Sequence, residues 1–278
     1  MGESVENDVS TELESDLRSA EVVFLGTGTS VGVPALGCSC KVCTSSDPRN
    51  QRTRCAIVFR TPKGNLLVDT PPDLRTQLLR EKIGLIHGVA YTHEHADHLF
   101  GLDDLRLFPF HLGHPVPLHC EQRVEKRIRH SYDYAFSDHA PTHPGAAPQL
   151  EFKRITPYET TEICGLSVQP VRVKHGPRFD VLGFRVGNFA YCTDVKEFPD
   201  RTLDSLQDLD VLVLGALRFR PHPTHLHLEE AIEVARKLNP KQTYLTHLSH
   251  DFDHGAVEAE LPERISLAYD GLRLRISV

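Results

Sequence analysis

Six consecutive residues, His93-Glu94-His95-Ala96-Asp97-His98, concentrate metal-binding side chains in one short stretch of the chain. Alternate residues of an extended segment point to the same side, so His93 and His95 can bind one ion. Asp97 and His98 then face a neighbouring position that suits a second ion. Neutral imidazole and carboxylate are the usual protein ligands of zinc, manganese and iron. Glu94 lies between the two histidines and should point away from the ion, which favours hydrolysis over oxygen chemistry.

Further candidate ligands follow short apolar runs that read as strands. Five such runs, Leu66–Val68, Val89–Thr92, Val171–Lys174, Phe189–Thr193 and Thr243–Thr246, are followed directly by Asp69, His93, His175, Asp194 and His247. Strands packed side by side would bring these ends to one edge of the sheets, where a rigid scaffold can hold a site.

Together these residues meet the needs of a hydrolase with two metal ions. Such a site holds two cations about 3.5–4 Å apart, joined by a hydroxide and usually by a bridging carboxylate. We expect one ion on His93, His95 and His175, the other on Asp97, His98 and His247, and Asp194 between them. Asp69 is better explained as a carboxylate that orients a ligand histidine than as a ligand itself.

A second constellation, Cys38-Ser-Cys40-Lys-Val-Cys43, places three thiols at short spacing. Three thiolates and one histidine form a closed tetrahedral zinc site of the structural kind. His250 is the candidate fourth ligand, and Cys55 is a competing one. Crowded cysteines in a reducing compartment indicate metal binding rather than disulfides.

Composition and charge limit the function classes. The formal charge is −7, of which residues 1–20 carry −5 and the other 258 residues only −2, so the strongly basic surface of a dedicated nucleic-acid binder is missing. Neither a signal peptide nor an apolar run of the ~18–20 residues that span a bilayer is visible, and we expect a cytoplasmic protein.

The sequence predicts a disordered acidic segment over residues 1–20, followed by one domain over residues 21–278. Pro71-Pro72-Asp73 signals a helix start, and Leu228, Ala231, Ile232, Ala235 and Leu238 form the apolar face of a helix that Asn239-Pro240 ends. Residues 108–150 show weak periodicity and are interpreted as a lid or an insertion. The glycines of Gly26-Thr-Gly28-Thr-Ser30 are interpreted as a tight turn that needs positive φ rather than a phosphate cradle, since no helix signal follows.

The His93–His98 run resembles the H-x-H-x-D-H signature of the metallo-β-lactamase superfamily, and His175, Asp194 and His247 match the later ligands of its phosphodiesterase branch. The resemblance extends from about Phe24 to His250. It is closest to the phosphoribosyl cyclic phosphodiesterases of the carbon–phosphorus lyase pathway. That closer match rests on residues 25–34, the cysteine cluster, Asp69-Thr-Pro-Pro-Asp-Leu-Arg75 and Gly101-Leu-Asp-Asp-Leu-Arg106.

The resemblance implies an α/β (α+β) fold, a four-layer αββα sandwich with two mixed sheets flanked by helices. It also implies a second zinc site with the spacing of the cysteine cluster. In that family, a histidine six residues before an alanine of a helix contacts the scissile phosphate, and His225 stands six residues before Ala231. His227 occupies a position where relatives often carry Ser or Thr, so a contribution from His222 or His227 stays open.

We expect a metal-dependent phosphodiesterase that acts on a small phosphodiester. A cyclic phosphodiester is one option for the substrate. Two divalent cations (zinc or manganese, with iron as a further option) and one structural zinc are the expected cofactors, with a metal-bridged hydroxide as nucleophile and Asp97 and His225 as the catalytic residues. The alternatives are a ribonuclease Z-like endonuclease that processes tRNA 3′ ends and a non-catalytic binding or carrier protein; a lactamase or thioesterase is a weaker option. No nucleic-acid or membrane partner is expected, and the sequence leaves a homodimer open.

Overall fold

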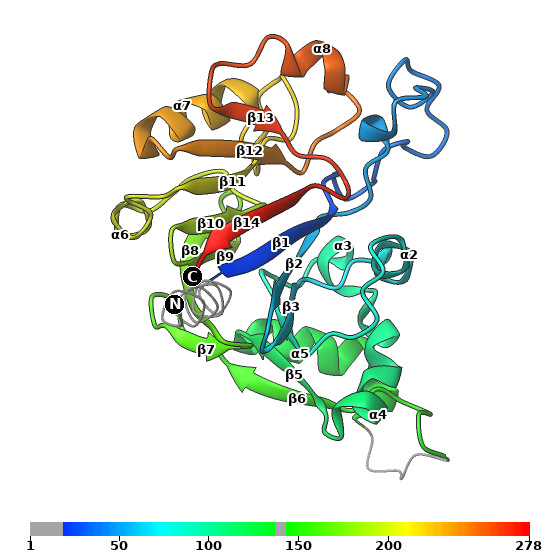
Figure 1. Cartoon of the computed structure of the whole chain (residues 1–278). Coiled ribbons are helices and arrows are strands. Elements are labelled where there is room, and N and C mark those ends of the chain that lie inside the picture. Colours follow the sequence, from blue (N-terminus) through cyan, green and yellow to red (C-terminus); the bar gives the residue numbers. More distant parts are fainter. Residues whose placement is uncertain (1–18, 137–142) are drawn as a thin grey trace, which may run out of the picture.

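Two seven-stranded sheets make up the centre of the computed structural model, which describes residues 19–136 and 143–278 (Figure 1). The first sheet has the order β14-β1-β2-β3-β4-β5-β6 and the second the order β13-β12-β11-β10-β9-β8-β7. Each sheet is mixed, because β14 to β3 and β7 to β10 pair antiparallel while β3 to β6 and β10 to β13 pair parallel. The first sheet consists of β1 (Ser19–Gly26), β2 (Ala56–Thr61), β3 (Gly64–Val68), β4 (Gly88–Ala90), β5 (Val116–Cys120), β6 (Leu150–Arg154) and β14 (Arg273–Ser277).

The second sheet consists of β7 (Thr161–Ile163), β8 (Leu166–Lys174), β9 (Asp180–Val186), β10 (Phe189–Cys192), β11 (Val211–Gly215), β12 (Gln242–Thr246) and β13 (Ile265–Leu267). The helices are α2 (Leu74–Arg80), α3 (Ala96–Leu99), α4 (Phe108–Leu112), α5 (Gln122–Ser131), α6 (Asp200–Ser205), α7 (Leu228–Leu238) and α8 (His254–Glu258), with 3-10 turns η1 (Pro48–Asn50), η2 (Leu102–Leu107) and η3 (Asp133–Ala135). None of these helices is long and apolar enough to cross a membrane.

Three apolar clusters separate four layers. One lies between the sheets and joins residues such as Phe59 and Phe189, whose rings meet edge to face at 5.4 Å. The second packs α2, η2 and α5 on the outer face of the first sheet, and the third packs α7 and α8 on the outer face of the second. Burial of these faces is the main stabilising contribution. The expected αββα sandwich is therefore confirmed.

The expected helices and strands agree closely with the structure. Helix α7 begins and ends at the two residues that bound the predicted apolar face, and Asn239 closes it in the left-handed conformation. Helix α2 follows Asp73 as expected. All five apolar runs overlap strands, namely β3, β4, β8, β10 and β12.

The interpretation of residues 108–150 as a lid or an insertion needs correction. Strand β5 lies inside the first sheet between β4 and β6, and α5 packs its apolar residues against the same sheet. The strand was hard to recognise because Pro117 and His119 interrupt a run of only five residues. Residues 137–142 of this segment, and residues 1–18 of the predicted acidic segment, lie outside the described residues, whereas Ser19 and Ala20 already belong to β1.

Candidate metal centre

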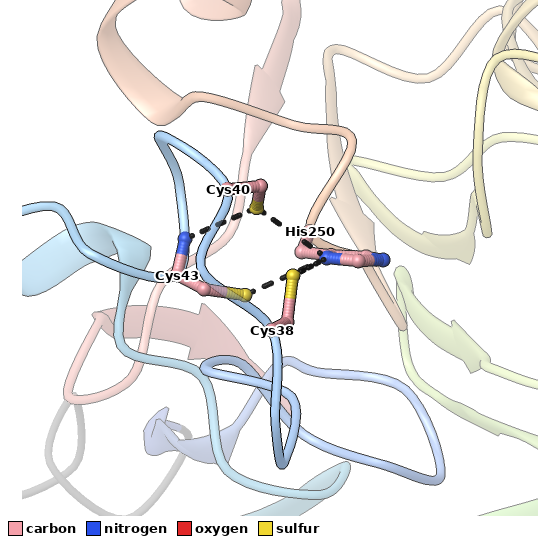
Figure 2. Close-up of side chains that lie close together, drawn as sticks. All are labelled: Cys38, Cys40, Cys43 and His250. Atoms are coloured by element: carbon pink, nitrogen blue, oxygen red, sulfur yellow. Dashed lines mark hydrogen bonds between the residues drawn. The ribbon is translucent and has the colours of Figure 1, made fainter.

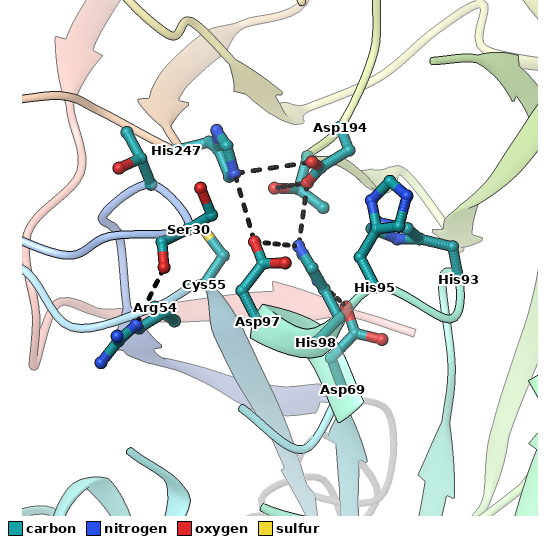
Figure 3. A network of polar contacts seen from close by, with 12 residues as sticks. Ser30, Arg54, Cys55, Asp69, His93, His95, Asp97, His98, Asp194 and His247 are labelled. Atoms are coloured by element: carbon teal, nitrogen blue, oxygen red, sulfur yellow. Dashed lines mark hydrogen bonds and ion pairs between the residues drawn. The ribbon is translucent and has the colours of Figure 1, made fainter. Parts of the chain in front are cut away.

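The ends of five strands meet at one edge of the two sheets. Strands β3 and β4 are parallel neighbours in the first sheet, and β8, β10 and β12 run in one direction in the second, because β9 is antiparallel to both β8 and β10. Their carboxyl ends therefore lie on the same side of the sandwich. Figure 3 shows the side chains delivered there, with Asp69 and the His93–His98 turn facing Asp194 and His247.

The first group of potential ligands comprises His93, His95 and His175, whose ring nitrogens lie within 4.8 Å of one another. Nε2 of His93 is 2.9 Å from Nδ1 of His95. The backbone is extended at His95, with φ −69° and ψ 154°, before α3 begins. That conformation turns the two rings toward one point, as the alternation of side chains in the sequence predicts.

The second group comprises Asp97, His98 and His247. The first turn of α3 places Asp97 beside His98, and a carboxylate oxygen of Asp97 lies 3.3 Å from Nε2 of His98 and 4.0 Å from Nε2 of His247. Both Nε2 atoms are buried without a hydrogen-bond partner among the described residues. Buried polar atoms without partners are costly in a protein interior, so these two nitrogens fit a cation that they would share.

Asp194 lies between the two groups. One carboxylate oxygen is 3.1 Å from Nε2 of His98, and the other is 3.5 Å from Nε2 of His247 and 3.8 Å from Nε2 of His175. A single carboxylate thus reaches both sets of imidazoles. This is the arrangement expected of a ligand shared between two cations.

Hydrogen bonds fix the orientation of three of the imidazole rings. The Thr92 hydroxyl donates to Asp69, so its contact of 2.9 Å with Nδ1 of His93 must be donated by the ring. Nδ1 of His98 lies 2.8 Å from the Asp69 carboxylate, and Nδ1 of His175 lies 2.9 Å from the carbonyl oxygen of Thr224. In each ring Nδ1 is the nitrogen that contacts the protein, and Nε2 is the one left for a metal ion.

Two groups of the centre, His93 and Asp194, have shifted pKa values that favour the protonation states a cation requires. Burial, together with the neighbouring His98, lowers the pKa of His93 well below its usual value, so this imidazole is neutral. Burial opposes ionisation of Asp194, yet the imidazoles of His247 and His98 hold its pKa well below the usual value. His98 differs from His93, because the carboxylates of Asp194 and Asp97 outweigh its burial and raise its pKa well above the usual value. Imidazole and carboxylate donors together suit zinc, manganese or iron.

Asp69 and Glu94 both lie outside the two groups. The side chain of Asp69 is fully buried and accepts from the backbone N–H and hydroxyl of Thr92 as well as facing His98, which suits the orienting position expected for it. Glu94 is directed toward Arg123 on α5, with 3.2 Å between its carboxylate and Nε of the arginine. The alternation of the His93–His95 segment therefore separates the acid from the imidazoles.

His225 is the member of the 222–227 segment that reaches the centre. Its ring stacks on His247 with 4.8 Å between centroids and lies 4.5 Å from the ring of His175. Burial and the neighbouring His247 lower its pKa to about 3. The ring of His222 lies 5.2 Å from the ring of His225, measured between centroids, and so reaches the proposed ligands through His225. His227 instead caps α7, where Nδ1 lies 2.8 Å from Glu230.

The cysteine cluster forms a separate site (Figure 2). Nδ1 of His250 lies 3.2 Å from the sulfur of Cys38 and 3.5 Å from the sulfurs of Cys40 and Cys43. The backbone N–H of Cys43, with contacts from the other members of the cluster, lowers the pKa of Cys40 to about 6, which favours its thiolate, whereas burial raises the pKa of Cys43 to about 11. Cys55 is not a member, because its sulfur lies beneath the other site, 3.4 Å from the Thr246 hydroxyl.

The glycine turn differs in detail from the expectation. Neither Gly26 nor Gly28 has a positive φ, whereas Gly32, two residues after this turn, has a φ of 69°. The two earlier glycines are needed for space, since a Cβ at Gly26 would lie 1.9 Å from the carbonyl oxygen of Arg54. Close packing on residues 52–54, which precede β2, explains them better than a left-handed turn.

Sequence reasoning missed several residues that support both sites. Thr92 and the Thr224 carbonyl orient histidines through contacts that no motif records. Arg52 is almost completely buried and donates to the carbonyl oxygens of Ser249 and Phe252, which flank His250. An arginine in an apparent loop carries no signal of such burial, because its partners lie about two hundred residues away.

Comparisons with known proteins agree with this geometry. The family model described as β-lactamase superfamily domain matches residues 64–248. A crystal structure of a diphosphatase from the PhnP family superposes with a TM-score of 0.87 at 41% identity, covering 94% of this chain and 98% of that one. Zinc-bound PqqB from Methylobacterium extorquens shares the fold at 20% identity, with a TM-score of 0.74 over 91% of this chain and 99% of that one.

Among curated proteins, the chain is 36% identical over 256 residues to an octanoyltransferase of Porphyromonas gingivalis. This match covers 90% of the chain. The chain spans 50% of the length of that protein. The family model and the PhnP-family structure both cover the residues of the candidate metal centre, so the chain belongs to the β-lactamase superfamily and, within it, groups with the PhnP family.

Proposed function

We propose that the protein is a metal-dependent phosphodiesterase that hydrolyses a small phosphodiester. The observation that carries the proposal is the position of Asp194, which reaches His98 at 3.1 Å in one group and His175 at 3.8 Å in the other. A carboxylate within reach of two imidazole groups supports two adjacent cation positions.

In this proposal His93, His95 and His175 hold one divalent cation, Asp97, His98 and His247 hold the other, and Asp194 is shared. When bound, two such cations acidify a water molecule and neutralise negative charge on a phosphate. Asp69, Thr92 and the Thr224 carbonyl keep the ligand rings oriented, which preserves the spacing that the chemistry needs. Cys38, Cys40, Cys43 and His250 hold a structural zinc that ties the 38–43 loop to the segment after β12.

His225 is the proposed hydrogen-bond donor to the phosphate or to the leaving oxygen. Its side chain is 13% exposed, stacks on His247 and places Nδ1 3.9 Å from Asp194. Its low pKa means that it acts as a neutral imidazole, which donates one N–H without adding a full charge. Asp97, 14% exposed at its side chain, borders the space where the substrate would lie.

The PhnP-family relative is described as a diphosphatase, so a substrate in which a phosphate is linked to a second phosphate belongs in the same screen as simple diesters. The test uses protein of measured metal content and bis(p-nitrophenyl) phosphate. We expect turnover by the unaltered protein and its loss in Asp194→Ala. Full activity in that variant would overturn the two-cation proposal.

Two other outcomes would redirect it. Cleavage of a precursor tRNA with no turnover of small diesters would favour a ribonuclease Z-like activity. Failure of the fully metal-loaded protein to hydrolyse any diester would favour a binding or carrier function. The metals themselves, zinc, manganese or iron, follow from elemental analysis of the purified protein.

A further inference from the structure

Phe179 stands beside the metal centre with much of its ring exposed. The residue lies in the 175–179 turn between β8 and β9, and 40% of it is accessible to solvent. Its ring meets the ring of His95 edge to face, with 5.2 Å between centroids, and lies 6.4 Å from the ring of His175. One part of the ring therefore packs on two proposed ligands, and the rest is open.

The turn that carries Phe179 is held in place at several points. The backbone N–H of His175 donates to the carbonyl oxygen of Phe179 over 2.7 Å and closes the turn. Nδ1 of His175 is bound to the Thr224 carbonyl, and a Cβ at Gly176 would lie 2.6 Å from the Thr224 side chain. The exposed ring is thus a positioned apolar surface at the edge of an otherwise polar site.

Phe179 and His225 lie on different parts of the centre. Both rings lie near His175, with centroid distances of 4.5 Å for His225 and 6.4 Å for Phe179, but their other contacts differ. His225 stacks on His247, whereas Phe179 packs on His95. If His225 serves the leaving oxygen, the ring of Phe179 lies nearer the ester group that remains on the phosphate after hydrolysis.

We propose that Phe179 determines specificity by stacking on a planar ring in the retained ester group of the substrate. The inference rests on the proposed function and adds a substrate class, namely phosphodiesters whose retained group carries an aryl ring or a nucleobase. Aromatic rings stack favourably in offset or edge-to-face arrangements, and a partly exposed ring beside a phosphate site provides such a surface.

Binding of the corresponding monoester product tests the inference without turnover. Calorimetry with metal-loaded protein compares phenyl phosphate with methyl phosphate, which share the phosphate and differ in the ring. We expect phenyl phosphate to bind roughly tenfold more tightly to the unaltered protein. In Phe179→Ala the two ligands should bind within about twofold of each other, and Phe179→Trp should keep the preference.

Phe110→Ala is the matched control, since Phe110 is 57% exposed on α4 and makes no ring contact with a histidine among the described residues. It should keep the full preference. An unchanged preference in Phe179→Ala overturns the inference. Loss of metal from Phe179→Ala also overturns it, because Phe179 would then act by positioning His95. Absence of diester turnover in the unaltered protein, with the ring preference intact, would count against the proposed function alone.

Discussion

Nδ1 of His98 lies 2.8 Å from the carboxylate of Asp69, and both side chains are completely shielded from solvent. Asp69 follows β3 in the left-handed conformation, with φ 65°, and so turns its side chain under the neighbouring strand end. Thr92, which precedes the first histidine of the His93–His98 run, binds the same carboxylate twice. One buried acid therefore fixes the start of that run and one of its rings.

Replacement of Asp69 by Asn should weaken metal binding. The substitution keeps the size of the side chain but removes the charge that holds the proton on Nδ1 of His98. Loss of such an outer partner typically lowers metal affinity about 10- to 100-fold. Competition with a chromogenic chelator measures the change, and Asp210→Asn, at a surface pair with Lys241, is the control. Equal affinities in the two variants would contradict the orienting role of Asp69.

Replacement of Glu94 by Gln should leave metal content unchanged. Glu94 sits between two proposed ligands in sequence, but its carboxylate faces Arg123 rather than the candidate metal centre. His95→Ala, by contrast, should lose a cation. Elemental analysis of the two purified variants distinguishes them. A Glu94→Gln protein as poor in metal as His95→Ala would mean that Glu94 is a ligand.

Replacement of Cys40 by Ser should remove the structural metal and destabilise the fold. Three sulfurs and Nδ1 of His250 converge within 3.5 Å, so losing one thiolate opens the site. We expect the free energy of unfolding to fall by about 2–4 kcal/mol. Cys164→Ser, at a half-buried thiol outside the cluster, is the control. A loss of stability no greater than that of the control would argue against a metal at the cluster.

Residues that follow strands were predictable because strand ends and ligand types are both local features of the sequence. His175, Asp194 and His247 each directly follow an apolar run. Strands that run in one direction bring these three residues to the same edge of the sheet. Helix α7 was equally accessible, since a period of 3.6 and a stop signal lie within one short segment. The cysteine cluster was predictable as well, because three of its four proposed ligands lie within six residues and only His250 is distant in sequence.

Contacts between distant segments were not predictable in the same way. Arg52 binds carbonyl oxygens near His250, and Phe179 packs on His95, yet neither residue type nor spacing signals these pairs. Strand β5 was missed because tertiary burial, rather than alternation, places His119 and Pro117 in a sheet. Such features follow from packing, which a single sequence does not state.

His119 should make stability depend on pH. Burial, with a smaller effect from the nearby Lys153, lowers its pKa to about 4 from an ordinary value near 6.5. A lowered pKa means that the folded state favours the neutral ring. The contribution of His119 to the free energy of unfolding is therefore complete above pH 6.5 and is lost as the pH falls toward 4. Over that window we expect His119→Gln to lose less stability than the unaltered protein, by up to about 3 kcal/mol. Chemical unfolding at several pH values measures the difference, and parallel curves would contradict it.

Gly215 ends β11 directly beside the segment that carries Asp194. A Cβ at this position would lie 1.7 Å from the carbonyl oxygen of Thr193, far closer than atoms can approach. Gly215→Ala must therefore push β11 away from β10 and move Asp194, which has only a short reach to His98 and His247. We expect a loss of about 1–3 kcal/mol in stability together with weaker metal binding.

Gly84→Ala is the matched control, since a Cβ there meets no atom within 4 Å, and its stability should stay within about 0.5 kcal/mol. Unfolding curves and chelator competition on the two variants give both quantities. If Gly215→Ala lost stability but kept full metal affinity, the position of Asp194 would tolerate movement, and its role as a ligand shared by two cations would be wrong.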